Sequence, residues 1–142
     1  MSRIYWDTMI FIYWLEANPT FGKRVDAIWS RMLERNDELI TGALALGEVL
    51  AGAYKRGADK EHIQNVRRAF EGAVSEVVPF TAETADRFGQ IKGLLKIPSA
   101  DAIHLACAAS ANTDLFLTND RNLVGKFVPG IQFIASLDTQ LF

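Results

Sequence analysis

The sequence predicts an α/β fold in which helices cover both faces of a parallel five-stranded sheet, giving a three-layer α/β/α sandwich. Short apolar runs of strand length alternate along the chain with longer segments of helical periodicity, an order typical of parallel sheets joined by right-handed crossovers. Acidic residues follow two of the strand-like runs, at the position where open parallel sheets bind ligands. Because the chain has 142 residues, we predict a single domain spanning 1–142.

The first strand and the first two helices are predicted near the N-terminus. Residues 3–6 form an apolar run that is consistent with a buried strand, and residues 9–16 are apolar nearly all round, as in a deeply packed helix. A break at residues 18–20 precedes an amphipathic helix that ends near Asn36. The apolar residues of this helix recur with helical spacing: Val25, Ile28, Trp29, Met32 and Leu33.

The middle of the chain repeats this alternation. Residues 39–41 predict a second short strand, and residues 43–54 predict a helix of small and apolar residues that ends at Gly57. Residues 60–72 have the pattern of another amphipathic helix. Residues 74–80 then predict a third strand.

The remaining elements follow in the same order. A helix over residues 81–95 opens with Thr81, a good capping residue, and a second helix runs from Pro98 to about Ala111. Residues 114–120 predict a fourth strand that ends in polar residues. Residues 131–136, after Gly130, predict the fifth.

Composition excludes several classes of protein. The 15 basic and 17 acidic residues give a net charge of −2, so any contact with a polyanion must be local rather than spread over a basic surface. Cys107 is the only cysteine, and together with His62 and His104 it makes no convincing zinc set. Asp7 interrupts the apolar N-terminal stretch, which argues against a signal peptide or a membrane span. We therefore expect a soluble, cytoplasmic protein.

Four acidic residues are candidates for one functional site: Asp7, Glu48, Asp101 and Asp120. Asp7 and Asp120 follow the first and fourth strands, and they would face each other if those strands were neighbours where strand order reverses. The helix that carries Asp101 leads into the fourth strand. Glu48 lies in the helix after the second strand, so both helices could aim their acids at the same end of the sheet.

Each acid also has a structural interpretation. Asp7 could cap the helix that starts near Thr8, and Asp120 could be an ordinary turn residue. Asp101 could simply interact favourably with the positive end of the dipole of its helix, which Ser99 could cap. Glu48 could be a solvated helix residue, although its apolar neighbours leave little polar face around it.

Carboxylates without histidine or thiolate partners suit Mg²⁺ or Mn²⁺, which usually keep several waters and also bind substrate phosphate. Unpaired acids in one cleft repel each other and raise each other's pKa, and a divalent cation removes that penalty. All four acids are therefore candidate metal ligands.

Neighbouring polar residues have weaker signals. Thr8, Thr118 and Asn119 could orient ligand carboxylates, but each is also an ordinary cap or turn residue. His104 lies one helical turn beyond the acid of its helix and can reach the same site, although a lone histidine on an apolar helix is more often hydrogen-bonded structure than a metal ligand. Cys107 is expected to pack in the core.

Basic and aromatic residues do not define an RNA-binding surface. Eight basic residues could contact phosphates or simply form a solvated face: Lys55, Arg56, Arg67, Arg68, Lys92, Lys96, Arg121 and Lys126. The large aromatic residues fit apolar faces and are expected in the core or in a subunit interface: Trp6, Phe11, Trp14, Trp29, Phe70 and Phe88.

Four short motifs together give the chain a family resemblance. They are IYWDT, LALGEVLAG, PSADAIHLACA and LFLTNDRNL, each with one of the four acids. In this order and spacing they resemble the PIN-domain ribonucleases, specifically the VapC-type toxins of toxin-antitoxin pairs, nearly from end to end. One departure is Met9, where many relatives carry a polar residue.

The resemblance implies a PIN-like sheet ordered 3-2-1-4-5 and an endoribonuclease that depends on Mg²⁺ or Mn²⁺. It implies that Asp7, Glu48, Asp101 and Asp120 form the metal-binding and catalytic set. It further implies an RNA substrate, a cognate antitoxin protein bound in a groove near the site, and a homodimer. Bound metal would lower the pKa of a water that attacks the phosphodiester.

Three alternatives remain. An enzyme that forms an aspartyl-phosphate is disfavoured, because Met9 stands where such families typically carry a second aspartate and no phosphate-binding loop compensates. A catalytically silent PIN-fold binding module is disfavoured by the presence of all four acids. The third alternative is a free-standing RNA-processing PIN nuclease without an antitoxin.

Overall fold

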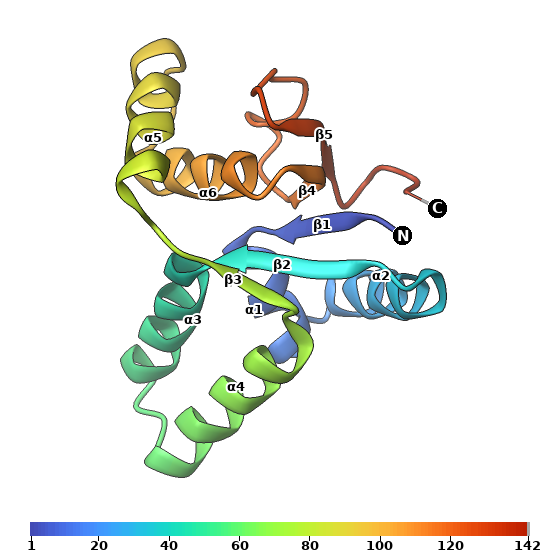
Figure 1. Cartoon of the computed structure of the whole chain (residues 1–142). Coiled ribbons are helices and arrows are strands. Elements are labelled where there is room, and N and C mark those ends of the chain that lie inside the picture. Colours follow the sequence, from blue (N-terminus) through green and yellow to red (C-terminus); the bar gives the residue numbers. More distant parts are fainter. Residues whose placement is uncertain (142) are drawn as a thin grey trace.

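Five strands and six helices make up the part of the chain that the computed structural model describes, residues 1–141 (Figure 1). They follow in the order β1 (Arg3–Trp6), α1 (Thr8–Leu15), α2 (Gly22–Arg35), β2 (Glu38–Gly42), α3 (Ala43–Lys55), α4 (Lys60–Ala73), β3 (Glu76–Val78), α5 (Ala82–Leu94), α6 (Ser99–Ser110), β4 (Thr113–Thr118) and β5 (Ile131–Ser136). Every predicted strand and helix is present.

The sheet has the strand order β3-β2-β1-β4-β5, and all of its strand pairs are parallel. This order and the α/β class confirm the predicted fold. Strand order reverses at β1 and β4, where Trp6 pairs with Leu117. Ligands of open parallel sheets bind beyond the carboxyl ends of the strands at such a reversal. The residues that follow β1 and β4 are therefore the first place to look for a site.

Helices cover both faces of the sheet: α5 and α6 lie on one side, and α1 to α4 on the other (Figure 1). Successive side chains of a strand point to opposite faces, so β1 contributes to both cores. Tyr5 packs in the core beneath α6, whereas Ile4 and Trp6 pack in the core beneath α1 and α2. Tyr5 is thereby brought next to the helix that carries Asp101.

Two details differ from the sequence predictions. Leu33 is 58% exposed, although it matches the apolar spacing of α2, because Ile28 and Met32 already occupy the buried stripe of that helix. The third strand covers only Glu76–Val78 instead of residues 74–80. Pro79 has no N–H to donate, so the ladder with β2 ends at the pair Gly42 and Val78.

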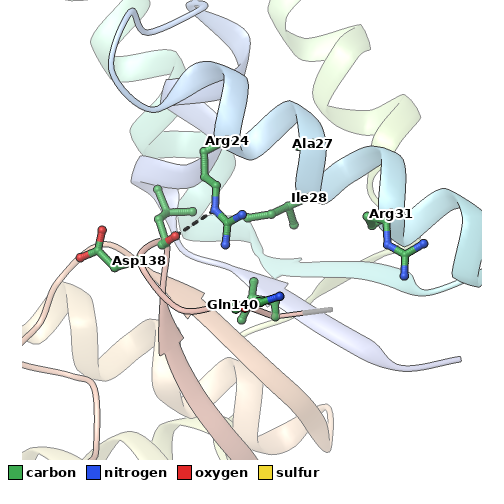
Figure 2. A pocket seen from close by; sticks show the side chains of 8 residues that line it. Arg24, Ala27, Ile28, Arg31, Asp138 and Gln140 are labelled. Atoms are coloured by element: carbon green, nitrogen blue, oxygen red, sulfur yellow. Dashed lines mark hydrogen bonds between the residues drawn. The ribbon is translucent and has the colours of Figure 1, made fainter.

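The segment that follows β5 is tied to α2. Figure 2 shows Arg24 reaching from α2 toward this segment, where its Nε donates to the Leu137 carbonyl oxygen at 3.0 Å. Its Nη2 donates to the Thr139 carbonyl oxygen at 2.7 Å. The pocket drawn there has a volume of about 500 Å³, and none of the four predicted site acids lines it. It lies outside the candidate site described below.

The helices of this fold are short. The longest, α2 and α4, have 14 residues each. Among residues 1–141, none is both long and apolar enough to span a bilayer.

Candidate functional site

A cleft beyond the carboxyl ends of β1 and β4 gathers all four predicted acids. Its volume is about 380 Å³. In Figure 1 the arrows of β1 and β2 point toward the same end of the sheet. The residues that line it come from the junction of β1 and α1, from α1, α3 and α6, and from the loop after β4: Asp7, Thr8, Met9, Ile12, Tyr13, Glu48, Ala100, Asp101, His104, Asn119 and Asp120. The structure thus brings together residues far apart in the sequence.

Asp7 is the single residue between β1 and α1, and it is only 9% exposed. It is the N-cap residue of α1, and its Oδ1 accepts a hydrogen bond from the Thr8 amide at 2.7 Å. Its Oδ2 accepts a hydrogen bond from the Thr118 hydroxyl at 2.9 Å. The capping role predicted as an alternative is therefore real, and it fixes the carboxylate at the mouth of the cleft.

Glu48 projects from α3, in which Ala45 and Val49 face the core. Its Oε1 accepts a hydrogen bond from the Thr8 hydroxyl at 2.6 Å and lies 2.9 Å from His104 Nε2. The hydrogen bond with His104, assisted by that with Thr8, lowers the pKa of Glu48 below its usual value against the opposing effect of burial. Glu48 is thus held as a carboxylate, not as a freely solvated helix residue.

Asp101 lies in the first turn of α6. The helix has Pro98 as its N-cap residue and no side-chain cap, so the suggested capping by Ser99 is wrong; Ser99 is the first residue of the helix itself. Burial, together with the charges of Asp7 and Asp120, raises the pKa of Asp101 from 3.8 to about 6. Asp101 is thus both partly buried and crowded by negative charge.

Asp120 serves in a turn as well as in the cleft. Its amide donates to Thr118 Oγ1 at 3.0 Å, and its Oδ1 accepts from the Asn122 amide at 2.9 Å. Both bonds are typical of polar residues in turns. Because its charge also raises the pKa of Asp101, its carboxylate lies within electrostatic reach of the other acids.

The donor set of the cleft fits a hard divalent cation. Asp7, Asp101 and Asp120 offer carboxylate oxygens. Burial and the charges of Asp7 and Asp120 raise the pKa of Asp101, and a bound cation would relieve the repulsion between these carboxylates. Within residues 1–141, no three histidine, cysteine, aspartate or glutamate side chains form a ready-made metal cage. Mg²⁺ does not need one, because it commonly binds through one or two carboxylates and retains several waters.

The polar neighbours have separate roles. Thr8 donates to Glu48 and Thr118 donates to Asp7, so both orient a carboxylate of the cleft, which was one of their two predicted roles. Asn119 lines the cleft but donates to the Tyr13 hydroxyl at 3.0 Å instead of to an acid.

His104 is 2% exposed and hydrogen-bonded, and it also lines the cleft, so it is both a structural residue and a neighbour of the candidate site. Cys107 is buried as expected, and burial raises the pKa of its thiol to about 11.

Tyr5 is a site residue that sequence reasoning missed. Its hydroxyl lies 2.7 Å from His104 Nδ1, behind the cleft. In the sequence it is one aromatic residue of a strand, and nothing nearby signals its partner 99 positions away. The contact becomes visible only in the fold, where β1 directs Tyr5 into the core beneath α6.

Several of the basic residues are already engaged. Arg56 pairs with Glu16, Arg67 with Glu71 and Arg121 with Asp138. Lys92 donates to the Ile97 carbonyl oxygen at 2.6 Å. Contacts of these residues with RNA therefore stay a prediction.

In metal-free protein we expect the free energy of unfolding to fall as the pH rises from 3.8 through about 6, because of Asp101. In that interval the folded carboxyl retains a proton that the unfolded one has lost, so raising the pH removes stability. Urea unfolding in EDTA measures this at about pH 5 and about pH 7. Asp101→Asn should be more stable relative to the parent at the higher pH. An equal difference at both pH values would contradict the crowding of Asp101.

The parallel sheet, with its order reversal at β1 and β4, is an α/β fold that carries acidic residues where such sheets bind ligands. The model of the PIN domain family matches residues 4–125, and the chain belongs to this family. No curated protein matches the chain with significance.

Several solved structures have the same fold as this chain. The chain aligns with VapBC2 from Rickettsia felis, bound to a promoter DNA fragment, at 18% identity and a TM-score of 0.67, covering 94% of this chain and 98% of that one. FitAB bound to a DNA fragment gives 20% identity, a TM-score of 0.68 and coverage of 98% of both chains. VapBC-5 from Mycobacterium tuberculosis gives 20% identity and a TM-score of 0.58, covering 94% of this chain and 98% of that one.

Proposed function

We propose that this chain is an endoribonuclease dependent on Mg²⁺ or Mn²⁺, and the toxin of a type II toxin-antitoxin system. The observation that carries the proposal is the cleft beyond the carboxyl ends of β1 and β4, which Asp7, Glu48, Asp101 and Asp120 all line. Burial, together with the charges of Asp7 and Asp120, raises the pKa of Asp101 there to about 6. Carboxylates forced together at the binding edge of a parallel sheet are costly unless they hold a cation. An all-oxygen site of this kind suits chemistry on phosphate esters.

Asp7, Glu48, Asp101 and Asp120 would hold the ion. When bound, Mg²⁺ or Mn²⁺ supplies positive charge beside the scissile phosphate and a water of lowered pKa for hydrolysis of the phosphodiester. The chain's other residues orient the ligands. Thr118 fixes one oxygen of Asp7, and Thr8 fixes one oxygen of Glu48. Such partners of metal ligands commonly tune metal affinity.

The toxin assignment is supported by the fold and length that this chain shares with a toxin-antitoxin complex from Klebsiella pneumoniae and with VapBC-5, a member of a family of toxin-antitoxin systems. A cognate antitoxin, assembly as a homodimer and a cytoplasmic location belong to the same proposal. The RNA-cleaving activity is a separate part of it, and it is supported by the acidic cleft. The two parts can therefore be tested separately.

Cleavage of RNA should require a divalent cation. Purified protein is expected to cut a circular RNA, which has no ends for an exonuclease, in Mg²⁺ or Mn²⁺. EDTA should abolish the cutting, and an excess of Mn²⁺ should restore it, because the acids alone repel both each other and the phosphate. Gel analysis of the circular RNA measures this. Cutting that persists in EDTA would contradict metal dependence, and no cutting in any divalent cation would favour a silent binding module.

Expression in a bacterial host tests the toxin part. Growth should stop when the parent chain is produced and resume when a protein encoded beside it is co-produced. A chain that cuts RNA but is unaffected by any neighbouring product would instead be a free-standing RNA-processing nuclease.

A further inference from the structure

A chain of buried hydrogen bonds runs behind the cleft from the backbone of Gly42 to Glu48. Tyr5 and His104 form its centre and are 0% and 2% exposed. The Tyr5 hydroxyl accepts a hydrogen bond from the Gly42 amide at 3.0 Å and lies 2.7 Å from His104 Nδ1. Across the imidazole ring, Nε2 lies 2.9 Å from Glu48 Oε1 and 3.0 Å from Thr8 Oγ1.

The neighbours of each atom define the direction of these bonds. Glu48 is a carboxylate that can only accept, and Thr8 donates its own hydroxyl proton to Glu48 at 2.6 Å. His104 Nε2 therefore carries the hydrogen and donates. In a neutral ring, Nδ1 is then the acceptor, and the Tyr5 hydroxyl is the donor beside it. Burial raises the pKa of Tyr5 well above its usual value, so the phenol retains the proton that it donates.

We propose that Tyr5 and His104 are positioning residues, which lock the imidazole in its Nε2–H form and thereby hold the Glu48 carboxylate at the cleft. The role toward metal rests on the proposed function, in which Glu48 is a ligand. Both hydrogen bonds to Glu48 reach the same oxygen, Oε1. Within the part of the chain that the structure describes, Oε2 of Glu48 is thus available to bind a ligand in the cleft. The hydrogen-bond chain itself depends on no ligand.

Packing keeps the phenol in place. The Tyr5 ring stacks on Phe116, with centroids 5.1 Å apart and an interplanar angle of 10°. The His104 ring meets Tyr5 nearly edge-on, at 5.8 Å and 74°. A side chain used only to fill the core needs no hydroxyl, whereas this one contacts a donor and an acceptor with the same oxygen.

Gly42 lies so close to Tyr5 and Cys107 that there is little room for a side chain at this position. Its φ of −91° is accessible to any residue, so backbone conformation does not require glycine here. A Cβ at this position would lie 2.9 Å from the Tyr5 hydroxyl oxygen and 3.1 Å from Cys107 Sγ. Glycine thus allows the backbone amide to approach the phenol closely.

Nitrogen NMR of the metal-free protein tests the proposal without any activity. The chain has two histidines, and the exposed His62 serves as an internal reference. With ¹⁵N-labelled histidine, His104 in the parent should show a protonated Nε2 and an unprotonated, hydrogen-bonded Nδ1. Tyr5→Phe removes the donor and should shift the Nδ1 signal of His104 while leaving His62 unchanged. A protonated Nδ1 in the parent, or an unchanged Nδ1 signal in Tyr5→Phe, would overturn the proposal.

Metal binding and kinetics test the consequence. Tyr5→Phe should weaken Mn²⁺ binding by about 10-fold to 100-fold and lower kcat at subsaturating metal, with little change in the KM for RNA. Tyr54→Phe, which alters an exposed tyrosine of α3, is the matched control and should behave like the parent. His104→Gln retains an N–H donor toward Glu48 and should retain more Mn²⁺ affinity than His104→Leu.

The two proposals fail in different ways. A parent that binds no Mn²⁺ and cuts no RNA would contradict the proposed function, while the imidazole signals still decide whether the hydrogen-bond chain exists. If the parent is active and Tyr5→Phe binds Mn²⁺ as tightly as the parent does, the positioning role is wrong and the proposed function stands.

Discussion

Asp7→Asn is expected to reduce RNA cleavage by at least about 100-fold while leaving the protein folded. Loss of a residue that merely supports a metal ligand typically costs about 10-fold to 100-fold, and loss of a ligand's charge should cost more. Asp7 is the least exposed of the four acids and lies at the reversal of strand order. Asparagine has the same shape but removes the negative charge. Initial rates on the circular RNA in saturating Mg²⁺ measure the effect.

The fold should survive because asparagine is about as good an N-cap as aspartate. The carbonyl oxygen of asparagine can still accept from the Thr8 amide, which now donates to Asp7 Oδ1. A matched control is Asp59→Asn, at the N-cap of α4, where Asp59 accepts from the His62 amide at 2.8 Å and lies outside the cleft. Both variants should melt close to the parent, and only Asp7→Asn should lose cleavage. Undiminished cleavage by folded Asp7→Asn would remove Asp7 from the site.

The fold was predictable because each element has its own local signal. The apolar run before Asp7 and the small-residue helix around Glu48 are visible without tertiary information, and alternation of strands with helices predicts a parallel sheet. Strand order is different, since composition and periodicity do not determine which strands become neighbours. The resemblance of four motifs to a known family supplied that order, and the structure has the same one.

The acids were predictable to different degrees. Asp7 and Asp120 follow strands, so their place at one end of the sheet follows from topology alone. Glu48 and Asp101 lie on helices, and where a helix side chain points depends on which face the helix buries. In α3 the buried residues Ala45 and Val49 leave Glu48 on the side of the cleft, a choice made by packing against the sheet.

The contacts that orient the site could not be predicted. Thr8 and Thr118 resemble ordinary cap and turn residues, and only the pairing of β1 with β4 brings Thr118 within 2.9 Å of Asp7. Likewise, Tyr5 and His104 meet because β1 directs alternate side chains to opposite faces. Long-range hydrogen bonds of this kind leave no pattern in a single sequence.

Asp101→Asn should weaken the binding of Mn²⁺ by about 10-fold or more, with no loss of folding. The carboxylate is surrounded by like charge, so it gains more from a bound cation than from its local position in the helix. Its interaction with the dipole of α6 contributes only about 0.3–1 kcal/mol. Removing the charge also relieves repulsion from Asp7 and Asp120, which offsets that small loss.

Glu61→Gln is the matched control, because Glu61 also lies in the first turn of a helix, α4, but does not line the cleft. A general effect of neutralising an acid near a helix start would appear equally in both variants. An effect specific to the cleft would appear only in Asp101→Asn.

Titration of Mn²⁺, followed by the electron paramagnetic resonance signal of the free ion, tests most directly whether the acids form one cation site. We expect the parent and Glu61→Gln to bind Mn²⁺ with the same affinity and Asp101→Asn to bind it at least about 10-fold more weakly. Equal binding by the parent and by folded Asp101→Asn would contradict a shared cation site.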